Sequence, residues 1–185
     1  MELKAGVVSN ADALAKVFAV RAAVYMSEQG CPYEEEFDGN DYSCTHILGY
    51  VDEAPAAVMR IRYFAEFVKF ERVAILPRFR RSGISKTLMQ AAMDVARRKG
   101  YRHLYGHAQK RLTDYWANYG FKPLNKNFPL VFSDHEYVEV VAELEPHAEA
   151  ITLRSDPYVI LRREGDWDTE GPLELSAARP ATNPH

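Results

Sequence analysis

The stretch Glu71–Gly100, ERVAILPRFRRSGISKTLMQAAMDVARRKG, decides the fold of this chain. It opens with an apolar run that predicts a buried strand, which Pro77 ends because proline has no N–H to continue a sheet ladder. A short basic turn around Gly83 follows, where Ser82 or Ser85 can cap a helix. Apolar residues then recur every three or four positions, as on one face of an amphipathic helix. The stretch therefore predicts a strand–turn–helix unit.

The turn of this unit has the chemistry of an anion-binding site. Free N–H groups and the positive dipole end at a helix N-terminus favour phosphate, and Gly83 lets the backbone come close to it. Residues 71–111 contain eleven Lys and Arg against two Asp and Glu, a net charge of +9 in a chain of net charge −3. Neither the P-loop pattern nor the dinucleotide-binding glycine pattern is present. The turn is either a local site for a phosphate-bearing ligand or a basic, solvated helix start.

The composition is that of a single globular domain. The chain has 185 residues, 47% of them hydrophobic and 26% charged. No apolar run approaches the roughly 18 residues that span a bilayer, and the N-terminus lacks the apolar core of a signal peptide. Cys31 and Cys44 form no C-x-x-C pattern, so we expect reduced thiols, no metal and a cytoplasmic location. The acidic total charge argues against a nucleic-acid partner, and we expect no membrane partner.

The other predicted elements surround the strand–turn–helix unit. Alternation predicts a strand over residues 2–8, and Ser9 or Asn10 can cap a helix to about Met26. After a turn-rich acidic stretch we expect strands at Cys44–Val51, Ala56–Phe67 and Glu66–Leu76, the helix described above, a strand at Arg102–Ala108, a helix at Gln109–Tyr119, and strands at Phe121–Leu124 and Tyr137–Leu144. This order predicts an α/β (α+β) fold in which a mixed sheet has helices on both faces.

The acidic stretch allows two interpretations. From Ala22 to Met59 the chain has eight Asp and Glu and no Lys or Arg. It is either a solvated loop or an acidic wall that attracts a cationic acceptor such as an amine.

The C-terminal part of the chain has a different character. We expect residues 1–145 to form one domain and residues 146–185 to form an extension. Within the extension, Ile151–Leu153 and Tyr158–Leu161 could each form a short strand, and the sequence beyond Gly165 looks irregular. Nothing in it suggests chemistry, so we expect it to pack across the domain or onto the second subunit of a homodimer.

Three groups of residues resemble one known superfamily. Arg80-x-x-Gly83-x-Ser85 after a V-x-I-x-P strand resembles the acyl-CoA motif [QR]-x-x-G-x-[GA] of the GCN5-related N-acetyltransferase (GNAT) superfamily, from which Ser85 departs. Residues 111–121, RLTDYWANYGF, are similar to its later F-Y-x-x-x-G-F motif. The N-terminal half resembles the ElaA-like subgroup, and loosely the acyl-homoserine-lactone synthase branch, at Arg21, Tyr25, Glu28, Gln29, Pro32, Glu36, Asp38, Asp41 and His46. The resemblance covers about residues 2–144.

This resemblance implies a GNAT fold, with a central twisted sheet that is mixed but mostly antiparallel. It also implies transfer of an acetyl group from acetyl-CoA to a primary amine of a small molecule or peptide, by direct attack and without a metal. The residues that it assigns to acetyl-CoA are Val73, Ala74 and Ile75 beside the pantetheine and thioester, Arg80, Arg81, Ser82, Gly83, Ile84, Ser85 and Lys86 around the pyrophosphate, and Gln109 at the pantetheine. The residues that it assigns to the acceptor are Glu28, Glu36 and His46.

The implied reaction needs a base, because an amine is protonated near neutral pH. Glu71 is the first candidate, since relatives often use a carboxylate on this strand; the alternative is a strand-end acid paired with Arg72. His107 is the second candidate, with a hydrogen-bonded structural role as its alternative, and His46 is the third.

The residue that should protonate the leaving thiolate matches the family motif less well. The family's tyrosine, which protonates the leaving thiolate, is replaced here by Trp116, and an indole cannot act as a general acid. Tyr115 either reaches the sulfur by a local shift or is a core aromatic, in which case no side-chain acid is needed. A backbone N–H near Ile75 or Leu76 is expected to polarise the thioester carbonyl.

Three other functions stay open. Trp116 favours a non-catalytic acyl-CoA sensor or scaffold. The basic segment permits a nucleic-acid-binding module, whose affinity would fall steeply with added salt. A longer acyl donor would need a wide cavity near Ala57, Met59 and Ile61.

Overall fold

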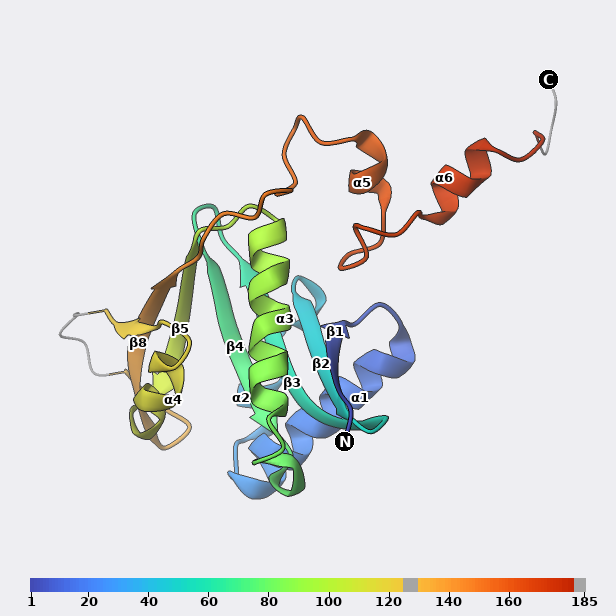
Figure 1. The fold of residues 1–185 in the computed structure, drawn as a ribbon. Coiled ribbons are helices and arrows are strands. Elements are labelled where there is room, and N and C mark those ends of the chain that lie inside the picture. Colours follow the sequence, from blue (N-terminus) through green and yellow to red (C-terminus); the bar gives the residue numbers. More distant parts are fainter. Residues whose placement is uncertain (125–129, 182–185) are drawn as a thin grey trace.

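The protein is described here from a computed structural model, which covers residues 1–124 and 130–181. Within these residues, one sheet of eight strands forms the centre of the molecule (Figure 1). The strands are β1 (Leu3–Val7), β2 (Thr45–Val51), β3 (Ala54–Tyr63), β4 (Val68–Ile75), β5 (His103–Gln109), β6 (Lys122–Pro123), β7 (Leu130–Phe132) and β8 (His135–Glu143). The α-helices are α1 (Ala11–Arg21), α2 (Tyr33–Glu36), α3 (Ile84–Arg98), α4 (Thr113–Ala117), α5 (Pro157–Leu161) and α6 (Pro172–Ala177). The other helical turns are the π-helical η1 (Ala22–Glu28) and the 3₁₀ turns η2 (Asn40–Tyr42), η3 (Pro77–Phe79) and η4 (Lys110–Leu112).

The sheet is open at one point between two neighbouring strands. Its strand order is β1-β2-β3-β4-β5-β8-β6, and β7 also pairs with β8. Among the described strands, β4 and β5 are the one parallel pair, and they pair only where Val68–Phe70 meets Leu104–Gly106. Beyond Phe70 and Gly106 the two strands diverge, which leaves a gap toward their C-terminal ends. The mixed, mostly antiparallel sheet is confirmed.

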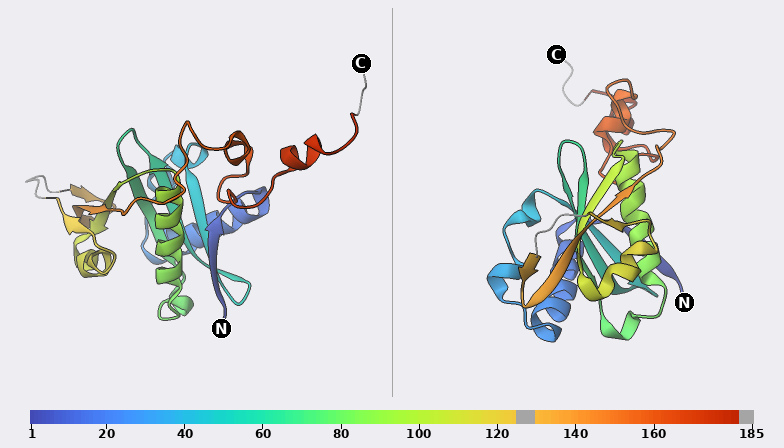
Figure 2. Two further views of the ribbon diagram at one scale, coloured as in Figure 1. Left: turned by 45° about the horizontal axis from the view of Figure 1, so that its top comes forward. Right: turned by 90° about the vertical axis from the view of Figure 1, so that its left-hand side faces the viewer.

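Helices cover both faces of the sheet, as the right-hand view of Figure 2 shows. Apolar side chains of α1 and η1 pack against Leu48, Val58 and Ala74 on one face. Apolar side chains of α3, including the fully buried Leu88 and Met89, pack against the other face in the larger core cluster. Within residues 1–124 and 130–181, no helix has the length and apolar character needed to cross a bilayer.

A β-bulge in β4 decides which side chains share a face. The register passes from Val58↔Ala74 to Arg60↔Glu71, so β4 has one residue more than β3 between these pairs. Arg72 has a φ of +53°, in the left-handed region that residues other than glycine rarely adopt. Because side chains alternate along a strand, the extra residue brings Glu71 to the same face as Ala74, the face that α1 covers.

The first helix begins as expected and then changes its form. Asn10 caps it, because its side-chain oxygen accepts the N–H of Ala13 over 2.8 Å. The α-helix ends at Arg21, and the chain continues as the π-helical η1. Apolar spacings of three and four do not reveal where a π-turn inserts its extra residue, so the sequence shows no break there. The acidic stretch that follows contains α2 rather than turns alone.

The expected strand at Tyr158–Leu161 is wrong, because this segment lies in the helix α5. Asp156 accepts the N–H of Tyr158 over 2.9 Å, and Pro157 stands in the first turn, where its missing N–H is not needed. An Asp-Pro pair before an apolar run is a helix-start signal that outweighs the β-branched residues of so short a segment.

The remaining expectations for the extension are also corrected. Residues 151–153 form no strand; the N–H of Ile151 donates instead to the carbonyl of Arg98 over 2.8 Å. The sequence beyond Gly165 is not wholly irregular, since α6 begins at Pro172 and Glu174 accepts the N–H of Gly171 over 2.6 Å. Residues 182–185 of the extension lie outside the described part of the chain.

The extension crosses the C-terminal end of α3 (Figure 1). Trp167 is buried in the main core cluster, and Arg98 of α3 donates to Glu149 over 2.8 Å and to Asp168 over 2.7 Å. Several large apolar side chains of the extension stay exposed, namely Leu153, Tyr158, Ile160, Leu161, Leu173 and Leu175. The boundary at residue 145 and the homodimer stay predictions.

Candidate active site

The gap between β4 and β5 opens into a cavity of about 990 Å³. Its walls come from both strands, from η1 and α2, from the segment around α4, and from the β7–β8 hairpin. Ten of the residues expected at the site line it: Glu28, Glu36, Glu71, Val73, Ala74, Ile75, Arg80, His107, Gln109 and Tyr115. The lining does not include His46 or Arg81–Lys86, the turn that continues from Arg80.

One backbone amide of β4 is directed into the gap. The N–H of Leu76 donates to the carbonyl of Ala56 over 2.9 Å, so it points toward β3 and is not available to a ligand. Hydrogen-bonding direction alternates along an antiparallel strand, so the N–H of Ile75 points away from β3. The carbonyl of Ile75 has the same direction, since it accepts from Nε of Arg80 over 3.1 Å. Of the two amides expected to polarise a carbonyl, Ile75 is therefore the one that has no acceptor on β3 or elsewhere in the described residues.

Two amides of the turn before α3 are unused. The N–H groups that already bond within the turn are those of Arg80, Arg81, Ser82, Ile84 and Lys86. The amides of Gly83 and Ser85 have no such acceptor among the residues that the structure describes. Gly83 is the N-cap and has a φ of +90°, a conformation that glycine adopts without strain. Two free amides at the start of a fifteen-residue helix suit an anion.

Arg80 joins this turn to η1. Its two terminal nitrogens donate to both carboxylate oxygens of Glu28, over 2.7 Å and 2.5 Å. The hydrogen bond from Arg80 lowers the pKa of Glu28. The arginine side chain is 44% exposed and the glutamate 37%, so the pair is a solvated one that a competing anion can open.

Three cationic side chains lie within 4.0 Å of the Glu71 carboxylate. Its carboxylate accepts from Nε of Arg60 over 2.8 Å and from Nζ of Lys69 over 2.7 Å, and Arg62 lies 4.0 Å away. Burial pushes the pKa of Glu71 up, but the hydrogen bond from Lys69 and the charge of Arg60 outweigh it and leave the pKa below its ordinary value. A carboxylate that is this well neutralised is a weak base.

His107 lies at the open end of β5, in the wall of the cavity. Its Nε2 is 2.8 Å from the hydroxyl oxygen of Tyr105, and that hydroxyl donates to Glu139 over 2.5 Å. Burial and then the charge of Lys69 lower the pKa of His107, against the opposing effect of Glu139 and Glu71. The imidazole is therefore neutral at pH 7 and able to accept a proton.

Both aromatic residues of α4 line the cavity, and they differ in their other contacts. Trp116 is 5% exposed and packs edge-on against Phe121, with ring centroids 4.8 Å apart. Tyr115 has a buried hydroxyl that makes no well-formed hydrogen bond to the described residues, although the hydroxyls of Ser85 and Tyr119 are close enough to influence its pKa. Burial raises the pKa of Tyr115, so its hydroxyl stays protonated. Gln109 likewise lines the cavity with a buried side-chain oxygen that has no partner in the described chain.

A buried ionic network takes up much of the acidic stretch. Arg21 donates to Glu36 and to Asp41, each over 2.5 Å, and Arg60 donates to Asp38 over 2.7 Å and to Asp41 over 2.9 Å. Both arginines are fully buried. These three acids are therefore neither a solvated loop nor an unpaired acidic wall. The role of Arg60 was missed; an arginine inside the apolar strand Ala54–Tyr63 was the signal for it.

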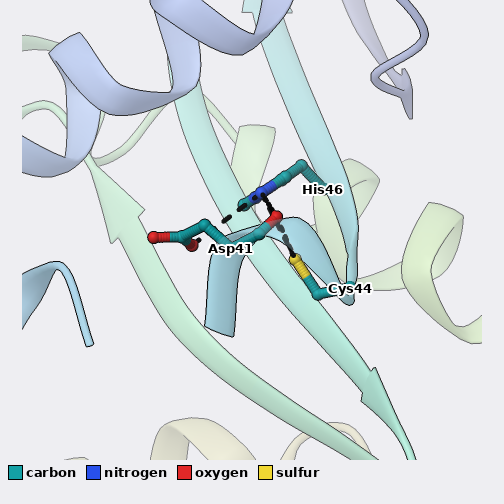
Figure 3. A group of neighbouring side chains, drawn as sticks. All are labelled: Asp41, Cys44 and His46. Atoms are coloured by element: carbon teal, nitrogen blue, oxygen red, sulfur yellow. Dashed lines mark hydrogen bonds and ion pairs between the residues drawn. The ribbon is translucent and has the colours of Figure 1, made fainter. Parts of the chain in front are cut away.

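Asp41, Cys44 and His46 lie together beside this network, with atoms suited to a metal ion within 4.8 Å of one another (Figure 3). The three residues contact one another directly: the Cys44 thiol donates to the carbonyl of Asp41 over 3.2 Å, and Nε2 of His46 is 3.3 Å from the Cys44 sulfur. The carboxylate of Asp41 is already held by two arginines, and burial raises the pKa of the Cys44 thiol to about 11. A neutralised carboxylate and a protonated thiol are poor metal ligands.

The sequence model of the Acetyltransferase (GNAT) family matches residues 15–121, a range that contains both cavity strands, the turn before α3, and α4. The chain belongs to this family. Members of the family are N-acetyltransferases that use acetyl-CoA, and this chain is one of them. The resemblance inferred from the sequence is confirmed.

Individual relatives agree with the family. A Bacillus subtilis protein named as an acetyltransferase is 31% identical over 116 residues, which are 61% of this chain and 79% of that protein. The N-acetyltransferase YjcF of the same organism is 29% identical over 67% of this chain and 89% of its own length. The protein ElaA of Escherichia coli is 28% identical over 58% of this chain and 73% of its own length, which agrees with the expected subgroup.

Solved structures share the fold. The crystal structure of Escherichia coli ElaA superposes with a TM-score of 0.65 at 23% identity, and covers 77% of this chain and 99% of ElaA. A GNAT family acetyltransferase from Elizabethkingia anophelis, solved with acetyl-CoA bound, has a TM-score of 0.61 at 14% identity over 77% of this chain and 98% of its own. At this level of identity the similarity is one of fold.

Proposed function

We propose that this N-acetyltransferase acts on a primary amine bound in the cavity between β4 and β5, with His107 as the general base. The observation that carries the proposal is the divergence of the two strands, which exposes the Ile75 amide and the His107 ring to one space. The amine and the acetyl group can therefore meet beside a backbone N–H that donates a hydrogen bond and a neutral imidazole that can accept a proton.

The residues present fit acetyl-CoA, which supplies the activated acetyl group. The unused amides of Gly83 and Ser85 suit its diphosphate, and Arg80 precedes them in the same turn as a cation. The buried, unpartnered oxygen of Gln109 suits an amide N–H of the pantetheine arm. The Ile75 amide is placed to polarise the thioester carbonyl.

His107 is preferred to Glu71 as the base for a physical reason. Glu71 is paired with Arg60 and Lys69, so protonating it would remove a negative partner from both cations and leave Arg60 with Asp38 and Asp41. Nδ1 of His107 has no hydrogen bond to the described residues, and it is not enclosed by protein. The amine nitrogen gives its proton to this imidazole as it bonds to the acetyl carbon.

Tyr115 is proposed as the hydrogen-bond donor to the leaving sulfur. Its hydroxyl is protonated and makes no well-formed hydrogen bond to the described residues, with Ser85 and Tyr119 as polar neighbours, although Trp116 occupies the family's usual tyrosine position. The thiolate that leaves then has a donor beside it as negative charge develops.

The acceptor is proposed to be a small molecule or a peptide end of modest charge. The cavity lining carries five acids and five Lys or Arg residues, so these charges balance. Glu28 and Glu36 line the cavity but are paired with Arg80 and Arg21, and His46 is outside the lining, so none of the three is assigned a contact to the amine here.

Release of the CoA thiol from acetyl-CoA, measured with a panel of primary amines, tests this function. We expect transfer to at least one amine, and a loss of about 10²–10⁴ in kcat/KM for His107→Gln with unchanged acetyl-CoA affinity. A fully active His107→Gln variant would remove the histidine from the mechanism. Tight acetyl-CoA binding without transfer to any amine would support the sensor instead.

A further inference from the structure

Three side chains on one face of the sheet form a hydrogen-bonded chain that ends at the proposed base. Tyr105 and His107 are two positions apart on β5, and Glu139 of β8 is the residue directly opposite His107 in the register. The Tyr105 hydroxyl is 2.5 Å from the Glu139 carboxylate and 2.8 Å from Nε2 of His107. All three therefore share a face, and the tyrosine bridges the other two.

The direction of the two hydrogen bonds follows from the donors that are present. An ionised carboxylate can only accept, so the single hydroxyl proton of Tyr105 goes to Glu139. The tyrosine oxygen can then only accept from His107, which requires the proton of the neutral ring to be on Nε2. Nδ1 is left with its lone pair.

The surroundings of His107 agree with this arrangement. Lys69 and Glu71 face it from β4, Glu139 and Tyr105 face it from β8 and β5, and the ring of Phe132 lies edge-on with its centroid 6.0 Å away. Burial and the hydrogen bond to Glu139 raise the pKa of Tyr105, so the tyrosine keeps its proton.

Tyr105 and Glu139 do not touch the acceptor space themselves. Both line a neighbouring cavity of about 1000 Å³ and are absent from the lining of the cavity between β4 and β5. Any effect that they have on the reaction must pass through His107.

We infer that Tyr105 and Glu139 are positioning residues for acetyl transfer, which hold His107 as the Nε2–H tautomer with Nδ1 free to take the proton of the amine. When Nδ1 accepts this proton, the ring becomes an imidazolium whose Nε2–H stays bonded to Tyr105. The carboxylate of Glu139 stabilises that positive charge through the tyrosine hydroxyl. The inference rests on the proposed function.

The tautomer can be measured on the unmodified protein. Nitrogen-15 NMR of histidine-labelled protein, with His107→Gln to assign the signal, reports which ring nitrogen carries the proton above pH 8. We expect Nε2–H in the wild type and a mixture of both tautomers in Tyr105→Phe. A wild-type His107 with its proton on Nδ1 would overturn the inference, whatever the activity.

Kinetics then test whether the chain acts through the base. Tyr105→Phe and Glu139→Gln should each lower kcat roughly tenfold, a part of the 10²–10⁴ that a positioned base contributes, with little change in acetyl-CoA affinity. In the His107→Gln background, Tyr105→Phe should have no further effect. Tyr101→Phe and Glu143→Gln are the matched controls, and they should stay at wild-type activity.

Failure of the positioning role and failure of the proposed base give different results. If His107→Gln lowers transfer but Tyr105→Phe and Glu139→Gln do not, the positioning role is wrong and the base is retained. If Tyr105→Phe lowers activity equally with and without His107, the tyrosine is structural. If His107→Gln has no effect, the proposed base itself has failed.

Discussion

Arg60 and Glu71 face each other across β3 and β4: Nε of the guanidinium donates to the carboxylate over 2.8 Å, and a terminal nitrogen lies 2.7 Å from the same oxygen. Arg60 is fully buried, and Glu71 is 9% exposed. This pairing gives Glu71 a structural role, which agrees with His107 on β5 as the proposed base.

Glu71→Gln should therefore destabilise the protein without changing the chemistry. Loss of charged hydrogen bonds to Arg60 and Lys69 should lower the free energy of unfolding by about 1–3 kcal/mol at pH 7. Because the folded state lowers the pKa of Glu71 from 4.5, this contribution is present above pH 4.5 and is lost as the pH falls through the folded-state pKa. Denaturant titrations of both proteins across this range measure it. The acid limb of kcat/KM should only move to lower pH in Glu71→Gln, because Glu71 raises the pKa of His107; a loss of about 10²-fold or more in kcat/KM at pH 7 would instead show that Glu71 takes part in the reaction.

The pH dependence of transfer should follow His107. Burial and Lys69 lower the pKa of this histidine below 6.5, while Glu71 and Glu139 limit the shift. The neutral base therefore predominates at pH 7, and kcat/KM should fall as the pH drops through the lowered pKa of His107. Initial rates with one amine across this range measure the acid limb. The same limb persisting in His107→Gln would assign it to another group.

Gly83→Ala should weaken acetyl-CoA binding at least tenfold. The new Cβ has room, with Leu3 at 3.5 Å, but a φ of +90° strains any L-residue and shifts the amide that faces the diphosphate. Gly100→Ala is the matched control, since Gly100 has a φ of +85° at the other end of α3. Calorimetric titration should show normal affinity in the control alone. Equal affinities in the two variants would show that the turn does not bind the ligand.

Glu28→Gln should strengthen acetyl-CoA binding modestly. Removing the carboxylate frees Arg80 for the diphosphate, and because the pair is exposed the gain should not exceed about 1 kcal/mol, or roughly fivefold in Kd. Glu53→Gln, which breaks a comparable exposed contact to Lys4, is the control. Weaker binding in Glu28→Gln would mean that the ion pair holds the site open rather than competing for it.

The features that could be predicted from the sequence are those encoded by residues close together along the chain. The strand that ends at Pro77, the turn at Gly83 and the helix after it are encoded by local signals, and the structure has all three. The role of Glu71 was not predictable in this way, because its partner Arg60 is eleven residues away on another strand. Their alignment depends on the bulge at Arg72.

The hydrogen-bonded chain behind His107 was missed for the same reason. Tyr105 and Glu139 are 34 residues apart, and only the β5–β8 register brings them together. The helix α6 is a different case: Pro172 and Glu174 are local start signals that an irregular-looking composition concealed.

The central claim is that the turn before α3 and the free edge of β4 together hold the donor. Amide chemical shifts during titration with CoA test it most directly. We predict large shifts for the amides of Gly83, Ser85 and Ile75, and little change for Leu76, whose N–H is bonded to Ala56. Saturable binding that leaves Gly83, Ser85 and Ile75 unchanged would contradict the account.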